Sequence, residues 1–163
     1  MTDPVQIAEE LAPRFAARAA AHDADASFPA DDVADLRASG LLGLLVPERL
    51  GGMGAGFADY VRVAEALARG SGSTALVFNM HASVTGALAG VPDDLARQMG
   101  APEAFFTARD AALAAAVDGA FYGVAITERE AGSRLSALQT TYAKEGDGYR
   151  LRGSKSVCTG AGH

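Results

Sequence analysis

The sequence predicts a mostly α-helical protein, with an all-helical N-terminal domain over residues 1–118 followed by an incomplete antiparallel β-barrel segment over residues 119–163. Three observations predict this class. Alanine, the strongest helix former, supplies 36 of the 163 residues. Apolar residues recur at helical spacing as far as about residue 118. Beyond that point they alternate with polar residues in the two-residue period of a strand.

The first helix is expected to begin at Pro4, capped by the preceding aspartate, and to end near Ala21 before a polar stretch. Its apolar stripe consists of Ile7, Leu11 and Phe15. Pro13 predicts either a kink or a later start. A second helix should open after Pro29 and stop at Gly40, where glycine suits the end of a helix.

Four further helices are expected after a buried apolar run and a glycine-rich loop. They are predicted from Phe57 to Ala68, from Thr74 to Ala89, after Pro92 and after Pro102. The apolar face of the first of these consists of Phe57, Tyr60, Val61, Ala64 and Leu67. The helix from Thr74 is apolar around most of its circumference, which predicts burial on several sides.

Strands are expected to start between Gly119 and Ile126. The predicted strands are Phe121–Ile126, the alternating residues 138–143, Tyr149–Arg152 and Lys155–Cys158, with a turn at residues 144–148. So few short strands make a poor core. The chain is therefore expected to stop partway through a β domain.

Composition argues against several classes of function. The net charge of −6 and the pI of about 5.0 oppose nucleic-acid binding, which needs clustered Lys and Arg. The longest strongly apolar run, Leu41–Val46, is far shorter than the roughly 20 residues of a membrane span. No signal peptide is evident, so a cytoplasmic location is expected. The single Cys and three scattered His residues predict no metal site.

Two glycine-rich segments were compared with nucleotide-binding motifs, and neither fits. Gly51–Gly56 is followed by Phe57, where the GxGxxG spacing requires a glycine, and no second strand follows. Gly148–Ser156 has Ser154 at the position where a phosphate loop requires lysine. We interpret the first as a helix connector and the second as part of the β segment.

Three polar features could carry chemistry. His81 lies in an apolar helix, which favours a hydrogen-bonded core or pocket histidine. Cys158 has no orienting carboxylate nearby, so a small buried residue is a better interpretation than a nucleophile. The loop Thr127–Ser133 holds hydroxyls and free N–H groups that suit a heterocycle edge or a phosphate, although by itself it is typical of a solvated turn.

At this loop the sequence resembles the acyl-CoA dehydrogenase family of flavoproteins. Residues 28–54 are similar to its N-terminal helical domain. Ile126-Thr127-Glu128 with Ala131-Gly132-Ser133 is similar to its V-T-E-P-G-A-G-S-D stretch, and Lys155 and Thr159 match its G-x-K-x-W-I-T-N-G stretch. The resemblance implies a helical domain, a middle β-barrel and a C-terminal four-helix domain, the last of which carries the catalytic carboxylate.

The resemblance also implies the ligands. FAD would accept a hydride from the β-carbon of an acyl-CoA in fatty acid metabolism, and the full-length protein would be a homo-oligomer. The implied cofactor contacts are Val124, Ile126, Thr127, Ser133, Val157, Cys158 and Thr159. Thr127 would meet the flavin ring edge, Ser133 the FAD pyrophosphate or the acyl-CoA, and Thr159 the reactive nitrogen. No residue of this chain is assigned as catalytic.

Departures from the family pattern keep alternatives open. Arg129 and Glu130 replace Pro-Gly, Arg134 replaces Asp, and Val157 stands where an aromatic usually packs on the flavin. Residues 158–161 are more similar to flavin-dependent monooxygenases of the same fold. Three hypotheses follow: a dehydrogenase, a monooxygenase, or a truncated chain that is inactive alone and serves as an assembly partner.

Overall fold

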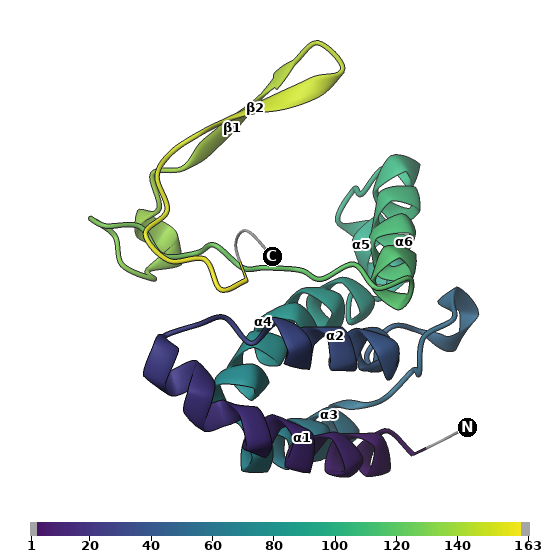
Figure 1. Ribbon diagram of the computed structural model, residues 1–163. Coiled ribbons are helices and arrows are strands. Elements are labelled where there is room, and N and C mark those ends of the chain that lie inside the picture. Colours follow the sequence, from purple (N-terminus) through teal and green to yellow (C-terminus); the bar gives the residue numbers. More distant parts are fainter. Residues whose placement is uncertain (1–2, 161–163) are drawn as a thin grey trace. The chain divides into compact units, whose positions relative to one another are not determined.

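The computed structural model describes residues 3–160, which form two compact units, residues 3–122 and residues 123–160 (Figure 1). The predicted β segment therefore has its last three residues, 161–163, outside the described range. The helices of the first unit are α1 (Pro4–Asp25), α2 (Ala30–Ala38), η1 (Leu41–Gly43), η2 (Glu48–Leu50), α3 (Phe57–Gly70), α4 (Gly72–Ala89), α5 (Asp93–Gln98) and α6 (Glu103–Val117). The second unit contains η3 (Leu135–Ala137), β1 (Thr141–Glu145) and β2 (Gly148–Arg152).

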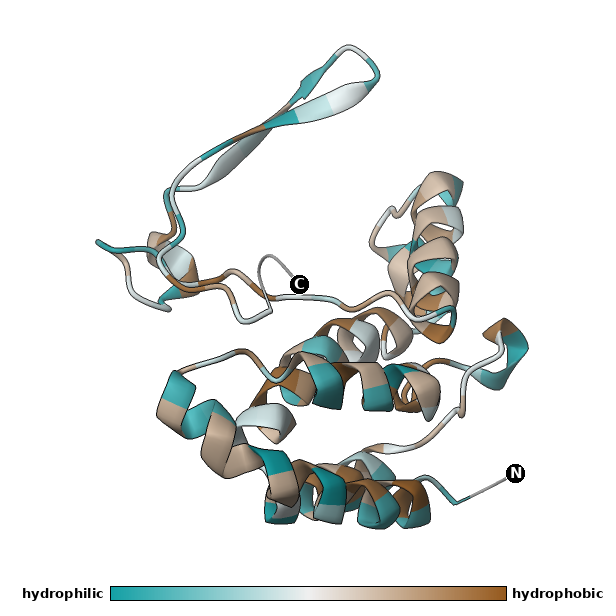
Figure 2. Ribbon diagram, in the orientation of Figure 1, coloured by the Kyte–Doolittle hydropathy of each residue, from teal (hydrophilic) through white to brown (hydrophobic). Residues whose placement is uncertain are grey.

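The core of the helical unit forms where α1 packs on α3 and where α3 and η1 pack on α4. Hydrophilic and hydrophobic bands alternate along α1, as expected of a helix with one buried side (Figure 2). The largest fully buried apolar side chains are Phe15, Phe78, Leu36, Leu41, Leu42, Leu44, Leu67 and Leu113. Gly70 permits close approach of α3 to α1, because a Cβ there would lie 2.2 Å from the carbonyl oxygen of Ala12.

A buried carboxylate joins three of these helices. Asp32 of α2 is fully buried and accepts hydrogen bonds from Arg18 of α1 at 2.5 Å and from the Thr74 hydroxyl of α4 at 2.6 Å. Arg18 also donates to Asp35 at 2.7 Å. The charge of Asp32 is thus paired and hydrogen-bonded, as burial of a carboxylate requires.

Two details of the predicted helices are wrong. The first helix starts at Pro4 as predicted, but it passes through Pro13 and continues to Asp25 instead of ending near Ala21. Its polar last turn is exposed, and exposed polar residues do not end a helix; it ends where Ala26 takes a φ of 48°. In α3 the buried residues are Val63, Ala66 and Leu67, whereas the predicted core residues Phe57 and Val61 are 77% and 47% exposed.

Helix α4 is buried on several sides, as predicted, through seven residues from Thr74 to Thr85. Among its large apolar side chains, Leu76 is 55% exposed. Within residues 3–160, no helix combines the length and the apolar character needed to cross a membrane.

The β segment contains one antiparallel hairpin. Strands β1 and β2 pair from Thr141 with Arg152 to Glu145 with Gly148, and Gly146 takes a φ of 58° in the two-residue turn. The predicted strand Tyr149–Arg152 is confirmed, whereas Phe121–Ile126 and Lys155–Cys158 are not strands. The first strand begins at residue 141, well after the predicted start between residues 119 and 126. Every hairpin residue is exposed, so neither face of this sheet is buried.

Candidate functional site

The two stretches that carry the predicted cofactor contacts lie side by side in the second unit. Val124 forms an isolated antiparallel bridge with Thr159, and the Ser156 N–H donates to the Thr127 carbonyl at 3.0 Å. Both pairs have the same register, which sets Ile126 opposite Val157. Residues 29 to 35 positions apart in sequence are thereby brought together as two short antiparallel segments.

A close backbone contact tightens the end of this pair. A Cβ on Gly123 would lie 2.8 Å from the Thr159 carbonyl oxygen and 3.7 Å from the Cys158 sulfur. Only a residue without a side chain fits at that distance. Cys158, predicted to be a small buried residue, is half-buried here.

The predicted contact residues differ in exposure. Val157 and Ile126 are 61% and 41% exposed, while Val124, Thr127 and Thr159 are half-buried. Within residues 3–160, the hydroxyls of Thr127 and Thr159 and the N–H of Thr127 make no hydrogen bond. These groups are therefore free donors beside an exposed apolar pair.

Ser133 is not joined to this pair by any hydrogen bond within the described residues. It is exposed and follows a loop that closes on itself, since Glu128 and Gly132 exchange backbone hydrogen bonds of 3.0 and 2.8 Å. Gly132 takes a φ of 60°, the left-handed conformation that glycine adopts readily. Ser133 thus directly follows the residue at which the loop closes.

Sequence reasoning missed the most strongly bonded residue of this unit, Glu128. It is 5% exposed and accepts from Lys155 Nζ at 2.8 Å, from the Thr140 hydroxyl at 2.5 Å and from the N–H groups of Gln139 and Thr140 at 2.7 and 2.9 Å. The Lys155 ammonium, followed by the Thr140 hydroxyl and the Gln139 N–H, lowers the pKa of Glu128 to about 2. The sequence shows two acids in the loop and Lys155 in the partner stretch, but no local pattern pairs Glu128 with that lysine.

His81 is a core histidine of the helical unit, one of the two interpretations that its sequence context favoured. It is 1% exposed; its Nε2 lies 2.8 Å from the Leu42 carbonyl oxygen, and its Nδ1 accepts the Tyr122 N–H at 3.0 Å. Its ring stacks with Phe121 and Tyr122 at centroid distances of 5.3 and 5.6 Å. Burial lowers its pKa, so the ring is neutral with its proton on Nε2.

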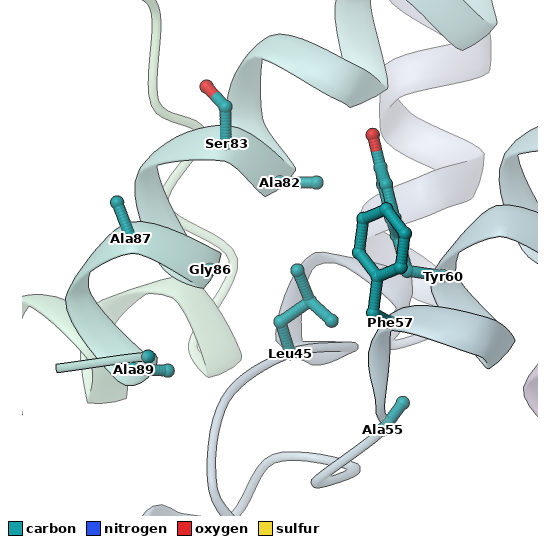
Figure 3. Close-up of a pocket in the computed structure, with 10 residues that line it drawn as sticks. Leu45, Ala55, Phe57, Tyr60, Ala82, Ser83, Gly86, Ala87 and Ala89 are labelled. Carbon is teal, nitrogen blue, oxygen red and sulfur yellow. The ribbon is translucent and has the colours of Figure 1, made fainter. Parts of the chain in front are cut away.

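The helical unit also contains a pocket of about 540 Å³ beside α4 (Figure 3). Its lining consists of Leu45, Ala55, Phe57, Tyr60, Ala82, Ser83, Gly86, Ala87, Ala89 and Gly90. The small residues of α4 form one wall, and the rings of Phe57 and Tyr60 stand across from them. This explains the high exposure of Phe57, which faces the pocket instead of the core.

Two contacts shape the pocket. The Tyr60 hydroxyl donates to the Asn79 side chain at 3.1 Å, which holds the ring between α3 and α4. A Cβ on Gly86 would lie 2.9 Å from a methyl of Leu45, so the glycine lets Leu45 reach the α4 backbone. The result is a mostly apolar recess with one hydroxyl, of Ser83, on its helical wall.

Comparisons with known proteins agree on one family. Residues 6–94 match the family model for the N-terminal domain of acyl-CoA dehydrogenases. A 3-sulfinopropanoyl-CoA desulfinase of Variovorax paradoxus is 32% identical over 157 residues, which cover 95% of this chain and 36% of the relative. A dibenzothiophene monooxygenase of Rhodococcus erythropolis is 39% identical over 79 residues, which cover 48% of this chain and 19% of the relative.

A solved structure shares the fold. The crystal structure of FMN-bound TdsC from Paenibacillus sp. A11-2 has a TM-score of 0.77 and 23% identity, over 99% of this chain and 37% of that chain. The chain thus spans about a third of the length of relatives such as the desulfinase, at 36%. Because the family model matches residues 6–94, more than half of the 163 residues, this chain belongs to the acyl-CoA dehydrogenase family.

Proposed function

We propose that this chain is part of a flavin-dependent oxidoreductase in which FAD accepts a hydride from the β-carbon of an acyl-CoA. The observation that carries the proposal is the antiparallel pairing of residues 124–127 with residues 156–159, which sets the stretches that hold the free donors of Thr127 and Thr159 side by side. Flavin-bound TdsC, a protein of the same fold, supports the cofactor class.

The residues of the pair fit a flavin. An isoalloxazine ring has a polar edge of carbonyls and ring nitrogens and two apolar faces. The Thr127 N–H and hydroxyl and the Thr159 hydroxyl suit that edge, and exposed Val157 and Ile126 suit a ring face. When bound, the flavin would supply a two-electron acceptor, and hydrogen-bond donors at its edge would favour the negative charge that builds on reduction.

The pocket beside α4 suits the acyl portion of a substrate. Its walls are mostly apolar, and its volume of about 540 Å³ falls within the range of small-molecule sites. The CoA relative, the desulfinase, supports a thioester substrate, because its similarity covers 95% of this chain. The full-length enzyme would be a homo-oligomer, as the family resemblance implies.

Neither buried carboxylate among residues 3–160 suits proton abstraction from the substrate. The two buried acids, Asp32 and Glu128, are both held by a cation and a hydroxyl. A general base needs a free lone pair within hydrogen-bond reach of the proton that it removes. This chain is therefore assigned binding roles only.

A flavin-dependent monooxygenase is the second candidate. The dibenzothiophene monooxygenase is 39% identical over 79 residues, a higher local identity than that of the desulfinase at 32%. The two candidates differ in what oxidises the reduced flavin: a separate electron acceptor in the first, molecular oxygen in the second.

The test uses the protein purified from its native host. We expect a bound flavin that bleaches when acyl-CoA is added under nitrogen. Bleaching only by an external reductant, with oxygen-dependent substrate hydroxylation, would favour the monooxygenase. A protein that retains no flavin would contradict both candidates.

The assigned donors are tested by Thr127→Val combined with Thr159→Val. Each change removes a donor from the polar ligand edge, so flavin affinity should fall by at least about tenfold for a loss of ~1–3 kcal/mol per unpaired group. Thr141→Val, on the exposed strand β1, is the matched control and should retain flavin fully. Equal flavin content in the double variant and the control would remove Thr127 and Thr159 from the site.

A further inference from the structure

Lys155 holds the backbone on both sides of Thr127. Its ammonium donates to the Ile126 carbonyl at 3.0 Å and to the Glu128 carboxylate at 2.8 Å. The adjacent Ser156 donates its N–H to the Thr127 carbonyl at 3.0 Å. Three consecutive residues, 126–128, are therefore fixed by two consecutive residues of the partner stretch.

Glu128 connects the same point to the base of the hairpin. Besides the lysine, it accepts the N–H groups of Gln139 and Thr140 and the Thr140 hydroxyl. Thr140 in turn packs against Gly153, where a Cβ would lie 2.2 Å from the Thr140 hydroxyl oxygen. One carboxylate thus links the loop, the start of β1 and the segment after β2.

The burial of these groups sets the cost of losing either partner. Glu128 has a side-chain exposure of 6% and Lys155 of 24%, so water has little access to the ion pair. Removing one partner leaves the other desolvated and unpaired, which costs more than loss of an exposed ion pair. The pair is therefore a strong local constraint in a unit that otherwise buries only Ala131.

The constraint acts on a residue whose donors remain free. The carbonyl of Thr127 is occupied by Ser156, whereas its N–H and hydroxyl have no partner within the described residues. Fixing both neighbours of Thr127 fixes the direction in which those donors point. Preorganised donors bind a ligand without the cost of ordering them at the moment of binding.

We propose that Glu128 and Lys155 are positioning residues, which act as a buried ion pair to aim the free donors of Thr127 at the bound cofactor. Neither residue was among the predicted cofactor contacts. The inference rests on the proposed function for the identity of the ligand, but the constraint itself belongs to the chain without ligand.

The first test needs no flavin. Amide hydrogen exchange of residues 1–163 is compared between the parent, Lys155→Met, Glu128→Gln and the control Lys144→Met, whose lysine lies on exposed β1. The Ser156 amide should exchange at least tenfold faster in the first two variants and unchanged in the control. Amides of the helical core, such as Leu113, report whether the fold is intact. Unchanged exchange of the Ser156 amide in both variants would show that the Glu128–Lys155 ion pair does not fix this backbone.

The second test separates positioning from a merely structural role. In the flavin-containing protein as its host makes it, Lys155→Met should shift the flavin absorption maximum and reduction potential, and Lys155→Arg should restore both. If the Ser156 amide exchanges faster but the flavin spectrum and reduction potential are unaltered, the ion pair has only a structural role and the proposed positioning role is wrong. A parent protein without flavin would refute the proposed function and, with it, the positioning role. The exchange experiment would still show whether the ion pair fixes the backbone around Thr127.

Discussion

At the scale of single residues, His81 shows how a buried titratable group can serve the fold instead of a reaction. Both of its nitrogens are committed, one to the Leu42 carbonyl and one to the Tyr122 N–H. Since Tyr122 is a donor, Nδ1 must stay unprotonated for the bond to persist. The imidazole therefore joins three segments of the helical unit only in its neutral form.

This arrangement predicts that acid destabilises the helical unit. Burial lowers the pKa of folded His81 below its ordinary value of 6.5, so below about pH 6.5 the unfolded chain binds a proton more readily than the folded one. The free energy of unfolding should fall as the pH drops from 7 towards 5. Urea denaturation at several pH values measures this slope.

His81→Phe is the informative variant for this slope. It leaves the Leu42 carbonyl and the Tyr122 N–H without their partner, so the unfolding free energy at pH 7 should fall by about 1–3 kcal/mol. Its slope between pH 7 and 5 should be flatter than that of the parent. A parental slope in the phenylalanine variant would show that His81 is not responsible.

At the scale of elements, the helices were predictable because their signals are local. Proline and an acidic residue at the start, glycine after the end and a stripe of apolar residues suffice to place α2 and α6. The buried face of α3 was not predictable from the sequence, because the helix carries two adjacent apolar stripes. Phe57 lies outside the core because it lines the pocket, which the local pattern does not reveal. The strand pattern failed where a strand needs a neighbour: residues 121–126 form an apolar, strand-like run, but only Val124 is paired within it.

The candidate site follows the same division. From the sequence, the family resemblance identified Thr127 and Thr159 as expected cofactor contacts. In the structure, the antiparallel register brings the stretches that contain them together. Glu128 could not be recognised as a hub from local pattern, because its partners Thr140 and Lys155 are 12 and 27 positions away in sequence. Long-range hydrogen bonds leave no periodic trace.

Contact between α1 and α3 gives a prediction at this scale. Gly70→Ala would set a Cβ 2.2 Å from the Ala12 carbonyl oxygen, and backbone cannot move aside as a flexible side chain can. We expect a loss of about 1–3 kcal/mol in unfolding free energy, typical of overpacking. Gly72→Ala, two positions on and with nothing within 4 Å, is the control and should change stability by no more than about 0.5 kcal/mol. Equal denaturation midpoints for the two variants would contradict the close approach.

At the scale of the whole molecule, the two units differ in what holds them together. Residues 3–122 have an apolar core in two clusters, one that contains Phe15 of α1 and a smaller one that contains Leu113 of α6. Among residues 123–160, only Glu128 and Ala131 are buried, and the hairpin is exposed throughout. Burial of apolar surface is the main favourable term in folding, so the two units should contribute very unequally to stability.

The final prediction concerns where the self-sufficient unit ends. The sequence pattern placed that boundary after residue 118, whereas the compact unit runs to Tyr122. The four extra residues matter, because Tyr122 donates its N–H to His81 and its hydroxyl to the Ala112 carbonyl at 2.6 Å, while Phe121 stacks on the His81 ring. A fragment of residues 1–118 loses all three contacts and leaves the buried His81 Nδ1 without a donor.

Thermal and urea unfolding of two fragments, followed by the circular dichroism signal of the helices, tests where the folding unit ends. Residues 1–122 should unfold cooperatively, with an unfolding free energy close to that of residues 1–163. Residues 1–118 should be weaker by about 1–3 kcal/mol, the cost of leaving a buried polar group unsatisfied. Addition of Tyr122→Phe to the longer fragment removes the hydroxyl bond alone and should fall between the two. If the two fragments were equally stable, the His81–Tyr122 contact would contribute nothing to the unfolding free energy. The folding unit would then end near residue 118, where the helical pattern ends.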